Sequence, residues 1–241
     1  NIIGQTKSAF RFDEVMDTGK IVLVKLAKGL IGDINANLLG MIFVNKLQVS
    51  AMRRQRAEKS TRKPYFLYVD EFQNFISGSG SFESILSEAR KYRLGLIVAH
   101  QYIDQLVKKG YEGGEEKIKN AVFGNVGTMM ALKIGAKDAE YMAKEMAPVF
   151  TETDLINLEG FNGCMKLSIN NQISRPFTIK TYKWWEETPE DKPDKECAEA
   201  LTQLSRLKYG RDKEFVGREI IRRIGASMTS ETGPTSNPLG I

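Results

Sequence analysis

The feature that most constrains the fold is a pair of short apolar runs joined by one helical segment. Residues 65–69 read "YFLYV" and residues 94–99 read "LGLIVA". Runs this rich in β-branched and aromatic residues, without polar alternation, are typical of strands that are buried on both faces. The segment between them, 82–92, has helical patterning, and a strand-helix-strand crossover makes its two strands parallel. We therefore expect two neighbouring parallel strands in an α/β fold.

Other segments extend this pattern on both sides. A strand is predicted at 20–26, a helix at 35–56, a strand at 127–134, a helix at 138–146, and an antiparallel hairpin from 164–170 and 177–182. The predicted fold is an α/β domain with a mostly parallel sheet, helices on both faces and a C-terminal β-hairpin.

The C-terminal quarter changes composition. Residues 186–196 ("EETPEDKPDKE") are acidic and contain proline, as linkers do. Residues 197–225 form a basic helical arm whose apolar residues, such as Leu201, Leu204 and Ile220, keep helical spacing. Residues 226–241 are predicted to be disordered. The expected domains are thus 1–185, the linker 186–196, the arm 197–225 and the tail 226–241.

Composition excludes several classes of function. The single histidine, His100, rules out multi-histidine metal sites and makes a Ser-His-Asp triad unexpected. Cys164 and Cys197 have no metal-ligand spacing. No apolar run approaches the roughly 18 residues of a membrane span. The net charge of +5 permits nucleic-acid binding without requiring it. Catalysis would depend on carboxylates, amides, lysine and arginine.

Two acids, Asp70 and Glu71, follow directly after the 65–69 run. Ligands of parallel α/β sheets bind at the carboxyl ends of the strands, where these acids lie. An apolar strand ending in Asp-Glu is typical of phosphoryl-transfer ATPases, in which the first acid holds Mg²⁺, directly or through water, and the second polarises the attacking water. The alternative is an acid pair that caps a loop or faces solvent.

Gln101 and Arg90 flank the second run. Gln101 should emerge beside the acid pair, where its amide could touch a γ-phosphate or the attacking water, whereas His100 reads as a packed residue. Arg90 ends the 82–92 helix at the opposite edge, roughly 15 Å away at ~1.5 Å per residue, so it could serve only a neighbouring subunit. Alternatively, it complements the helix dipole.

The motifs "FLYVDEFQNF", "ILSEARKYRLGLIVAHQ" and "NVGTMMALKIGAKDAEYMAKEM" resemble the C-terminal half of the HerA/FtsK superfamily motor domain. The resemblance covers residues 1–185 and is greatest to TraG/TraD-type coupling ATPases of conjugative type IV secretion. It implies a RecA-like P-loop NTPase core and a hexameric ring that uses ATP and Mg²⁺ to pump DNA. It implies Asp70 and Glu71 as the Walker B acids, Arg90 as arginine finger and Gln101 as nucleotide sensor.

The same resemblance implies relaxase or secretion-channel proteins as partners. It also implies a cytoplasmic location, or attachment to the inner membrane through sequence upstream of this chain. The chain departs from the family pattern at the phosphate-binding loop. Its nearest match to that motif is "NIIGQTKS", which has Asn1 and Thr6 where the motif requires glycines. We therefore expect the chain to be a C-terminal fragment that hydrolyses little or no ATP by itself.

Three basic segments are candidate DNA contacts: a cluster at the end of the 35–56 helix and just beyond it, a glycine-rich stretch at 108–116 that could be a channel loop of the kind the resemblance implies, and the helical arm at 197–225. The first comprises Arg53, Arg54, Arg56, Lys59, Arg62 and Lys63, and the second includes Lys108 and Lys109. Charged helix ends are also commonly just solvated. Three functions remain open: a conjugative DNA pump, a HerA-like DNA-processing motor or secretion-channel ATPase, and a scaffold that does not hydrolyse nucleotide.

Overall fold

The computed structural model describes residues 2–75, 81–107, 117–188 and 193–225. The chain divides into two compact units. The larger unit is Phe12–Lys192, and the smaller one combines Asn1–Arg11 with Pro193–Ile241. Each unit is described by itself below.

The larger unit begins with helices. They are α1 (Phe12–Thr18), the single turn α2 (Lys28–Ile31), the long α3 (Asp33–Arg53) and the 3₁₀ turn η1 (Arg54–Arg56). The predicted 35–56 helix is thus confirmed. The strand predicted at 20–26 is wrong: no described strand pairs with this segment, and Ile21 and Leu23 are 88% and 90% exposed. Apolar composition alone cannot make a strand, because its backbone groups need a partner strand.

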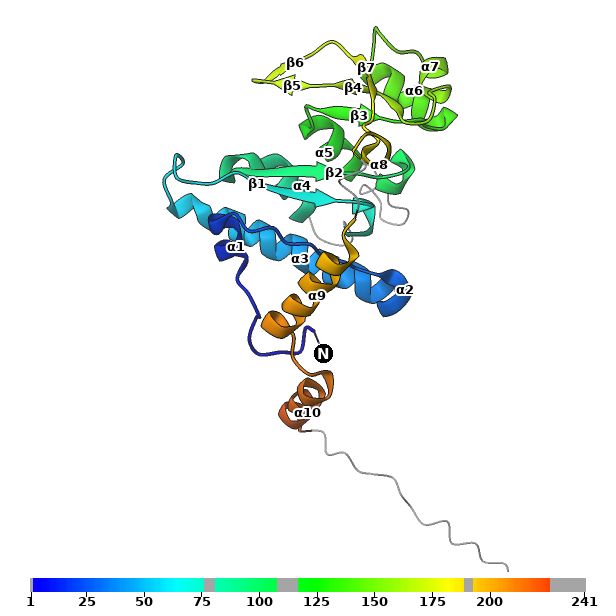
Figure 1. Cartoon of the computed structure of the whole chain (residues 1–241). Helices are drawn as coiled ribbons and strands as arrows, with labels where there is room; N and C mark the ends of the chain where they lie inside the picture. Colours follow the sequence, from blue (N-terminus) through cyan, green and yellow to red (C-terminus); the bar gives the residue numbers. More distant parts are fainter. Residues whose placement is uncertain (1, 76–80, 108–116, 189–192, 226–241) are drawn as a thin grey trace, which may run out of the picture. The chain divides into compact units, whose positions relative to one another are not determined.

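The two apolar runs form the predicted parallel pair. Strands β1 (Tyr65–Val69) and β2 (Leu94–Val98) pair in parallel, with Tyr65 opposite Leu94 and Val69 opposite Val98. They lie side by side in Figure 1, with α3 along one side of them. Between them come the 3₁₀ turn η2 (Phe72–Phe75), α4 (Ser81–Glu88) and the 3₁₀ turn η3 (Ala89–Tyr92). The predicted crossover is confirmed.

One face of this sheet carries the core and the other does not. Tyr65, Leu67 and Val69 pack into a cluster with residues of α1, α3, η2 and α4, which includes Met16, Val44, Leu47, Phe72 and Ile85. On the opposite face, Phe66 and Tyr68 are 58% and 74% exposed. The expectation of helices on both faces therefore does not hold for the described residues.

The second half of the larger unit is built on antiparallel strands (Figure 1). Strands β3 (Met129–Ala131), β4 (Asn162–Lys166) and β7 (Phe177–Lys180) form a sheet in the order β3-β4-β7. The small hairpin of β5 (Ser168–Ile169) and β6 (Gln172–Ile173) is inserted between β4 and β7. The predicted hairpin is confirmed, but the described sheets are small and only one of them is parallel.

Helices and turns complete this half. They are η4 (Ile103–Leu106), α5 (Lys117–Asn125), α6 (Ala136–Glu145), α7 (Glu152–Ile156) and α8 (Trp184–Glu187). A second core lies between the helices and the sheet, and it contains Ala139, Met142, Met146, Leu155 and Cys164. The helix predicted at 138–146 is therefore confirmed, and its apolar residues pack into this core.

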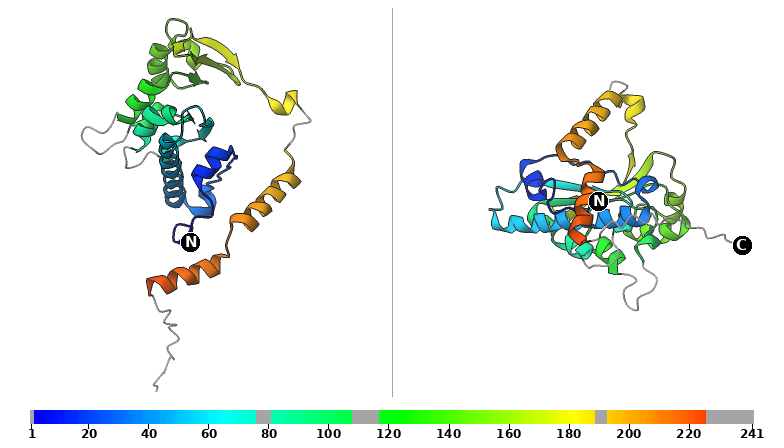
Figure 2. Two further views of the ribbon diagram at one scale, coloured as in Figure 1. Left: turned by 90° about the vertical axis from the view of Figure 1, so that its left-hand side faces the viewer. Right: turned by 90° about the horizontal axis from the view of Figure 1, so that it is seen from below.

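The smaller unit contains the predicted helical arm. Helices α9 (Lys195–Tyr209) and α10 (Lys213–Ile224) are separated by a bend (Figure 2). The N-terminal segment packs on α10: a Cβ added to Gly4 would lie 2.7 Å from Cδ1 of Ile220, and Val216 is buried. The "NIIGQTKS" stretch thus contributes to packing here. No helix in the described ranges is long and apolar enough to cross a membrane. The predicted tail, 226–241, lies outside those ranges.

Candidate functional site

The acid pair lies in a sharp turn at the carboxyl end of β1. Glu71 has a positive φ of 47°, which residues other than glycine rarely adopt. Its backbone N–H donates a 2.9 Å hydrogen bond to Oδ1 of Asp70, and the next residue, Phe72, is fully buried. The turn is anchored at its far side because the Phe72 N–H donates to the Ala99 carbonyl at 3.1 Å. The backbone therefore holds both carboxylates at the strand edge.

Gln101 lies beside Glu71, as the parallel pairing predicts. Its Nε2 donates a 3.1 Å hydrogen bond to Oε1 of Glu71 across the ends of β1 and β2. The structure thus brings Glu71 and Gln101 together, and Asp70 adjoins them through its bond to the Glu71 N–H. Their chemical roles stay predictions.

Two further residues contact Glu71 that were not singled out from the sequence. Nδ2 of Asn74 donates to the Glu71 carbonyl at 3.0 Å and to Oε2 at 3.1 Å. Nζ of Lys28 lies 3.6 Å from Oε2. The position of Asn74, three residues after Glu71 in a turn, is a local signal that could have indicated it. Lys28 is 43 residues away in sequence, and no local pattern indicates its contact.

Arg90 lies at the other end of the sheet. It belongs to η3, just before β2 begins, whereas Gln101 lies just after β2 ends. Five strand residues at about 3.3 Å each separate the two ends by roughly 16 Å. The exposed guanidinium donates from Nη2 to Oδ1 of Asn171, in the turn between β5 and β6, at 2.6 Å. Within this chain, Arg90 is therefore not part of the cluster around Glu71.

His100 is a packed residue, as predicted. Its ring contacts the Phe72 ring edge-on with centroids 5.6 Å apart, and Nδ1 lies 3.2 Å from the Tyr102 carbonyl. Burial lowers the pKa of His100 from its ordinary value, which outweighs the opposing effects of the Tyr102 carbonyl and Asp138. The imidazole supports the turn that carries Gln101.

The basic cluster needs a correction at Arg54. This residue is only 4% exposed, and its guanidinium bonds Oδ1 of Asp17 at 3.0 Å and the Lys63 carbonyl at 2.9 Å. A buried guanidinium cannot reach DNA phosphate, so Arg54 ties the end of α3 to α1 instead. Arg53 and Arg56 are exposed and stay candidates. Lys108 and Lys109 lie outside the described residues.

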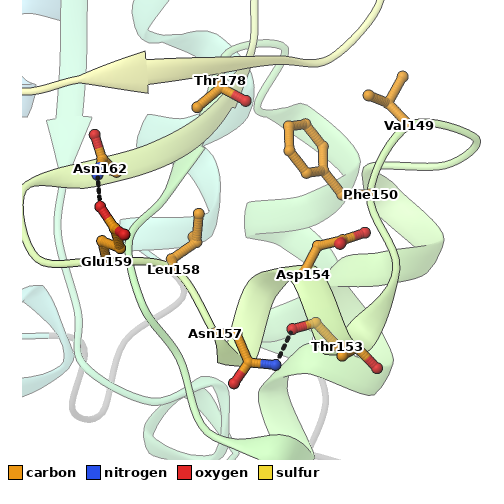
Figure 3. A pocket seen from close by; sticks show the side chains of 9 residues that line it. All are labelled: Val149, Phe150, Thr153, Asp154, Asn157, Leu158, Glu159, Asn162 and Thr178. Carbon is orange, nitrogen blue, oxygen red and sulfur yellow. Dashed lines mark hydrogen bonds between the residues drawn. The ribbon is translucent and has the colours of Figure 1, made fainter.

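A shallow cavity of about 470 Å³ lies in the second half of the larger unit (Figure 3). Its walls come from α7 with its flanking loops, β4 and β7, and include Phe150, Asp154 and Thr178. Several of its polar side chains are already bonded. Asn157 donates to the Thr153 carbonyl, Asn162 donates to Glu159, and Asp154 accepts from the N–H and hydroxyl of Thr151. None of the predicted site residues lines this cavity.

Few protein side chains at this site could bind a metal ion. No group of three or more His, Cys, Asp or Glu side chains among the described residues is arranged to hold a metal ion. Mg²⁺ differs from zinc in this respect, because it is commonly held by one or two carboxylates with water and phosphate oxygens. Asp70 is exposed, and only one of its carboxylate oxygens takes the Glu71 N–H. Asp70 therefore fits the role of such a ligand.

The middle of the chain is similar to a known protein family. A family model described as the TraM recognition site of TraD and TraG matches residues 64–154. These residues are therefore similar to that region of TraD and TraG. They include the acid pair, Arg90 and Gln101, so the resemblance that the sequence indicates is confirmed over the residues that carry the site.

Several solved structures also match the chain. A structure of the bacterial conjugative coupling protein TrwB, in an unbound monoclinic form, is 14% identical to the chain with a TM-score of 0.45. The match covers 64% of this chain and 37% of that one, so the chain spans little more than a third of the length of that protein. No curated protein matches the chain.

Proposed function

We propose that this chain is the C-terminal part of an ATP-driven DNA pump of conjugative type IV secretion, with a RecA-like motor domain. The observation that carries the proposal is the 3.1 Å hydrogen bond between Gln101 and Glu71 at the common carboxyl edge of β1 and β2. This edge is where α/β sheets bind ligands, and the segment that contains it matches TraD and TraG. A RecA-like sheet has more strands, and the exposed Phe66 and Tyr68 leave an apolar face for further layers.

In this proposal, each site residue has one task. Asp70 would hold Mg²⁺, through water, and the bound ion would supply positive charge beside the β- and γ-phosphates. Glu71 accepts a hydrogen bond from the attacking water and aligns it. Gln101 bonds Glu71 before hydrolysis and senses the γ-phosphate when nucleotide binds. The phosphate-binding loop comes from sequence upstream of this chain.

Arg90 acts in trans in this proposal. It lies at the sheet end opposite Glu71, and its guanidinium is exposed and bonds Asn171 in this chain. In a hexameric ring, an exposed arginine at this end would serve the nucleotide site of a neighbouring copy. The arginine stabilises negative charge in the transition state, an effect that is worth about 10³ to 10⁵ in kcat in other nucleotidases.

The first test is the Glu71→Gln variant of the full-length protein. We expect DNA-stimulated ATPase activity in the parent, and loss of turnover with retained ATP binding in the variant. The amide keeps the shape of the side chain but accepts hydrogen bonds less strongly, so binding and folding should survive. Unchanged turnover would show that Glu71 does not align the water.

Arg90 has its own test, because a trans residue can be complemented. Subunits carrying Arg90→Ala are mixed with subunits that lack a functional phosphate-binding loop. A ring that alternates the two kinds contains some complete sites, so activity should return at intermediate ratios. Activity that stays absent at every ratio contradicts a role in trans.

The family match also suggests a protein partner. The matched region is described as the TraM recognition site of TraD and TraG, and we propose that residues 64–154 bind a TraM-type protein of the transfer machinery. Crosslinking of the full-length protein to such a partner should give links within this segment. Crosslinks confined to α9 and α10 would instead assign recognition to the helical arm.

A further inference from the structure

The backbone around Lys28 is hydrogen-bonded, although it lies in a short connection. In α2, the N–H groups of Leu30 and Ile31 both donate to the Ala27 carbonyl, at 2.9 and 3.2 Å. The Gly32 N–H donates to the Lys28 carbonyl at 2.7 Å, and Gly32 then turns the chain into α3 with a φ of 79°. The backbone of Lys28 is therefore fixed at the start of a 21-residue helix.

The segments that carry Lys28 and Glu71 pack on the same spot of α3. Gly40 provides this spot: a Cβ added there would lie closer than 3.0 Å to two ring carbons of Phe75, and 3.1 Å from Cδ1 of Leu26. Phe75 ends the η2 turn that follows Glu71, and Leu26 lies two residues before Lys28. A glycine notch in α3 thus sets the distance between the lysine and the carboxylate.

The Glu71 carboxylate is contacted on both oxygens by groups from separate parts of the chain. Gln101 donates to Oε1 at 3.1 Å, and Asn74 donates to Oε2 at 3.1 Å. The ammonium of Lys28 lies 3.6 Å from Oε2, which is ion-pair distance without a direct hydrogen bond. Each carboxylate oxygen has two lone pairs, so this arrangement limits rotation of the group and leaves it able to accept a bond from water.

We propose that Lys28 is a positioning residue of the nucleotide site, which keeps the Glu71 carboxylate aligned for the attacking water. The inference rests on the proposed function and adds a residue from outside the segment that matches TraD and TraG. A general base must lie within hydrogen-bond reach of the proton that it accepts, so a carboxylate that rotates freely is a poorer base. Lys28 also balances one of two adjacent negative charges.

Two other roles for Lys28 give different measurements. As a direct phosphate ligand, it would contribute to nucleotide affinity. As an ordinary exposed ion pair, it would contribute little to kcat, to nucleotide affinity or to stability, because solvent screens such pairs. The side chains of Lys28 and Glu71 are 39% and 42% exposed, so a large effect of Lys28 on stability is not expected.

The experiment compares Lys28→Ala, Lys28→Arg and the control Lys46→Ala, an exposed lysine of α3, in the full-length protein. Measurements are kcat and KM for ATP, the Kd of Mg-ADP by fluorescence, and thermal unfolding. General base catalysis contributes about 10² to 10⁴ in rate, and partial loss of alignment should lower kcat about tenfold in Lys28→Ala. The Kd and the unfolding temperature should stay at parent values, with Lys28→Arg recovering much of the rate.

Two outcomes overturn the inference without touching the proposed function. An active parent with an unchanged kcat in Lys28→Ala would make the contact incidental. A loss of kcat that comes with an equal loss of Mg-ADP affinity would make Lys28 a phosphate ligand. A full-length parent that binds DNA but hydrolyses no ATP would refute the proposed function itself, together with the role given to Lys28.

Discussion

Gly40 offers a direct test of the packing that holds the site together. Replacing a glycine within a helix by alanine normally stabilises a protein by about 0.8 to 1 kcal/mol, because the unfolded chain loses freedom. At Gly40, the new Cβ would lie closer than 3.0 Å to two carbons of the Phe75 ring. Favourable carbon contacts are about 3.5 to 4.0 Å, so the ring must move by roughly 1.5 Å.

The expected balance is unfavourable. Overpacking of a packed region costs about 1 to 3 kcal/mol, and subtracting the helix gain leaves a net loss of about 1 kcal/mol for Gly40→Ala. Gly124 in α5 is the matched control, since no atom outside its own helical backbone and chain neighbours lies within 4 Å of a Cβ placed there. Gly124→Ala should gain about 0.5 to 1 kcal/mol, which makes the two variants differ by about 2 kcal/mol.

Urea denaturation followed by circular dichroism measures both free energies of unfolding. Adding Phe75→Leu to Gly40→Ala should recover stability relative to the sum of the single changes, because the shorter side chain vacates the notch. A Gly40→Ala variant as stable as Gly124→Ala would refute the packing argument. It would also remove the reason for expecting a fixed distance between Lys28 and Glu71.

Three further predictions concern single side chains. Burial lowers the pKa of His100 from its ordinary 6.5, so the unfolded chain binds the proton more tightly than the folded one, and the free energy of unfolding should fall as the pH drops below about 6.5. Urea titrations at several pH values measure this dependence, and His100→Gln should make it weaker. Arg54→Met should cost about 2 to 4 kcal/mol of unfolding free energy, whereas Arg53→Met on the exposed surface should stay within about 0.5 kcal/mol. Cys164 is buried, which raises the pKa of its thiol, whereas Cys197 is exposed, so Ellman's reagent should label Cys197 alone in the native protein and both cysteines in denaturant. Equal labelling rates of the two thiols in the native protein would contradict the burial of Cys164.

Much of the local structure could be predicted from the sequence. The β1 bounds, the parallel pairing with β2 and the adjacency of Glu71 and Gln101 follow from two apolar runs joined by one helix, because a crossover of that length leaves the chain few ways to return. The segment at 20–26 shows the limit of this reasoning. Its composition is that of a strand, but Ile21 and Leu23 are exposed and the segment forms no strand. A strand exists only where another backbone pairs with it, and composition does not show whether a partner is near.

The sequence by itself determined where the acids, the amide and the arginine stand along the chain, because patterning and turn residues act over a few positions. Only the tertiary structure decided which distant groups meet. It placed Lys28 beside Glu71 through the notch at Gly40, buried Arg54 against Asp17, and directed Arg90 toward Asn171. Such contacts depend on packing between elements that are far apart in sequence, and no local pattern carries that information.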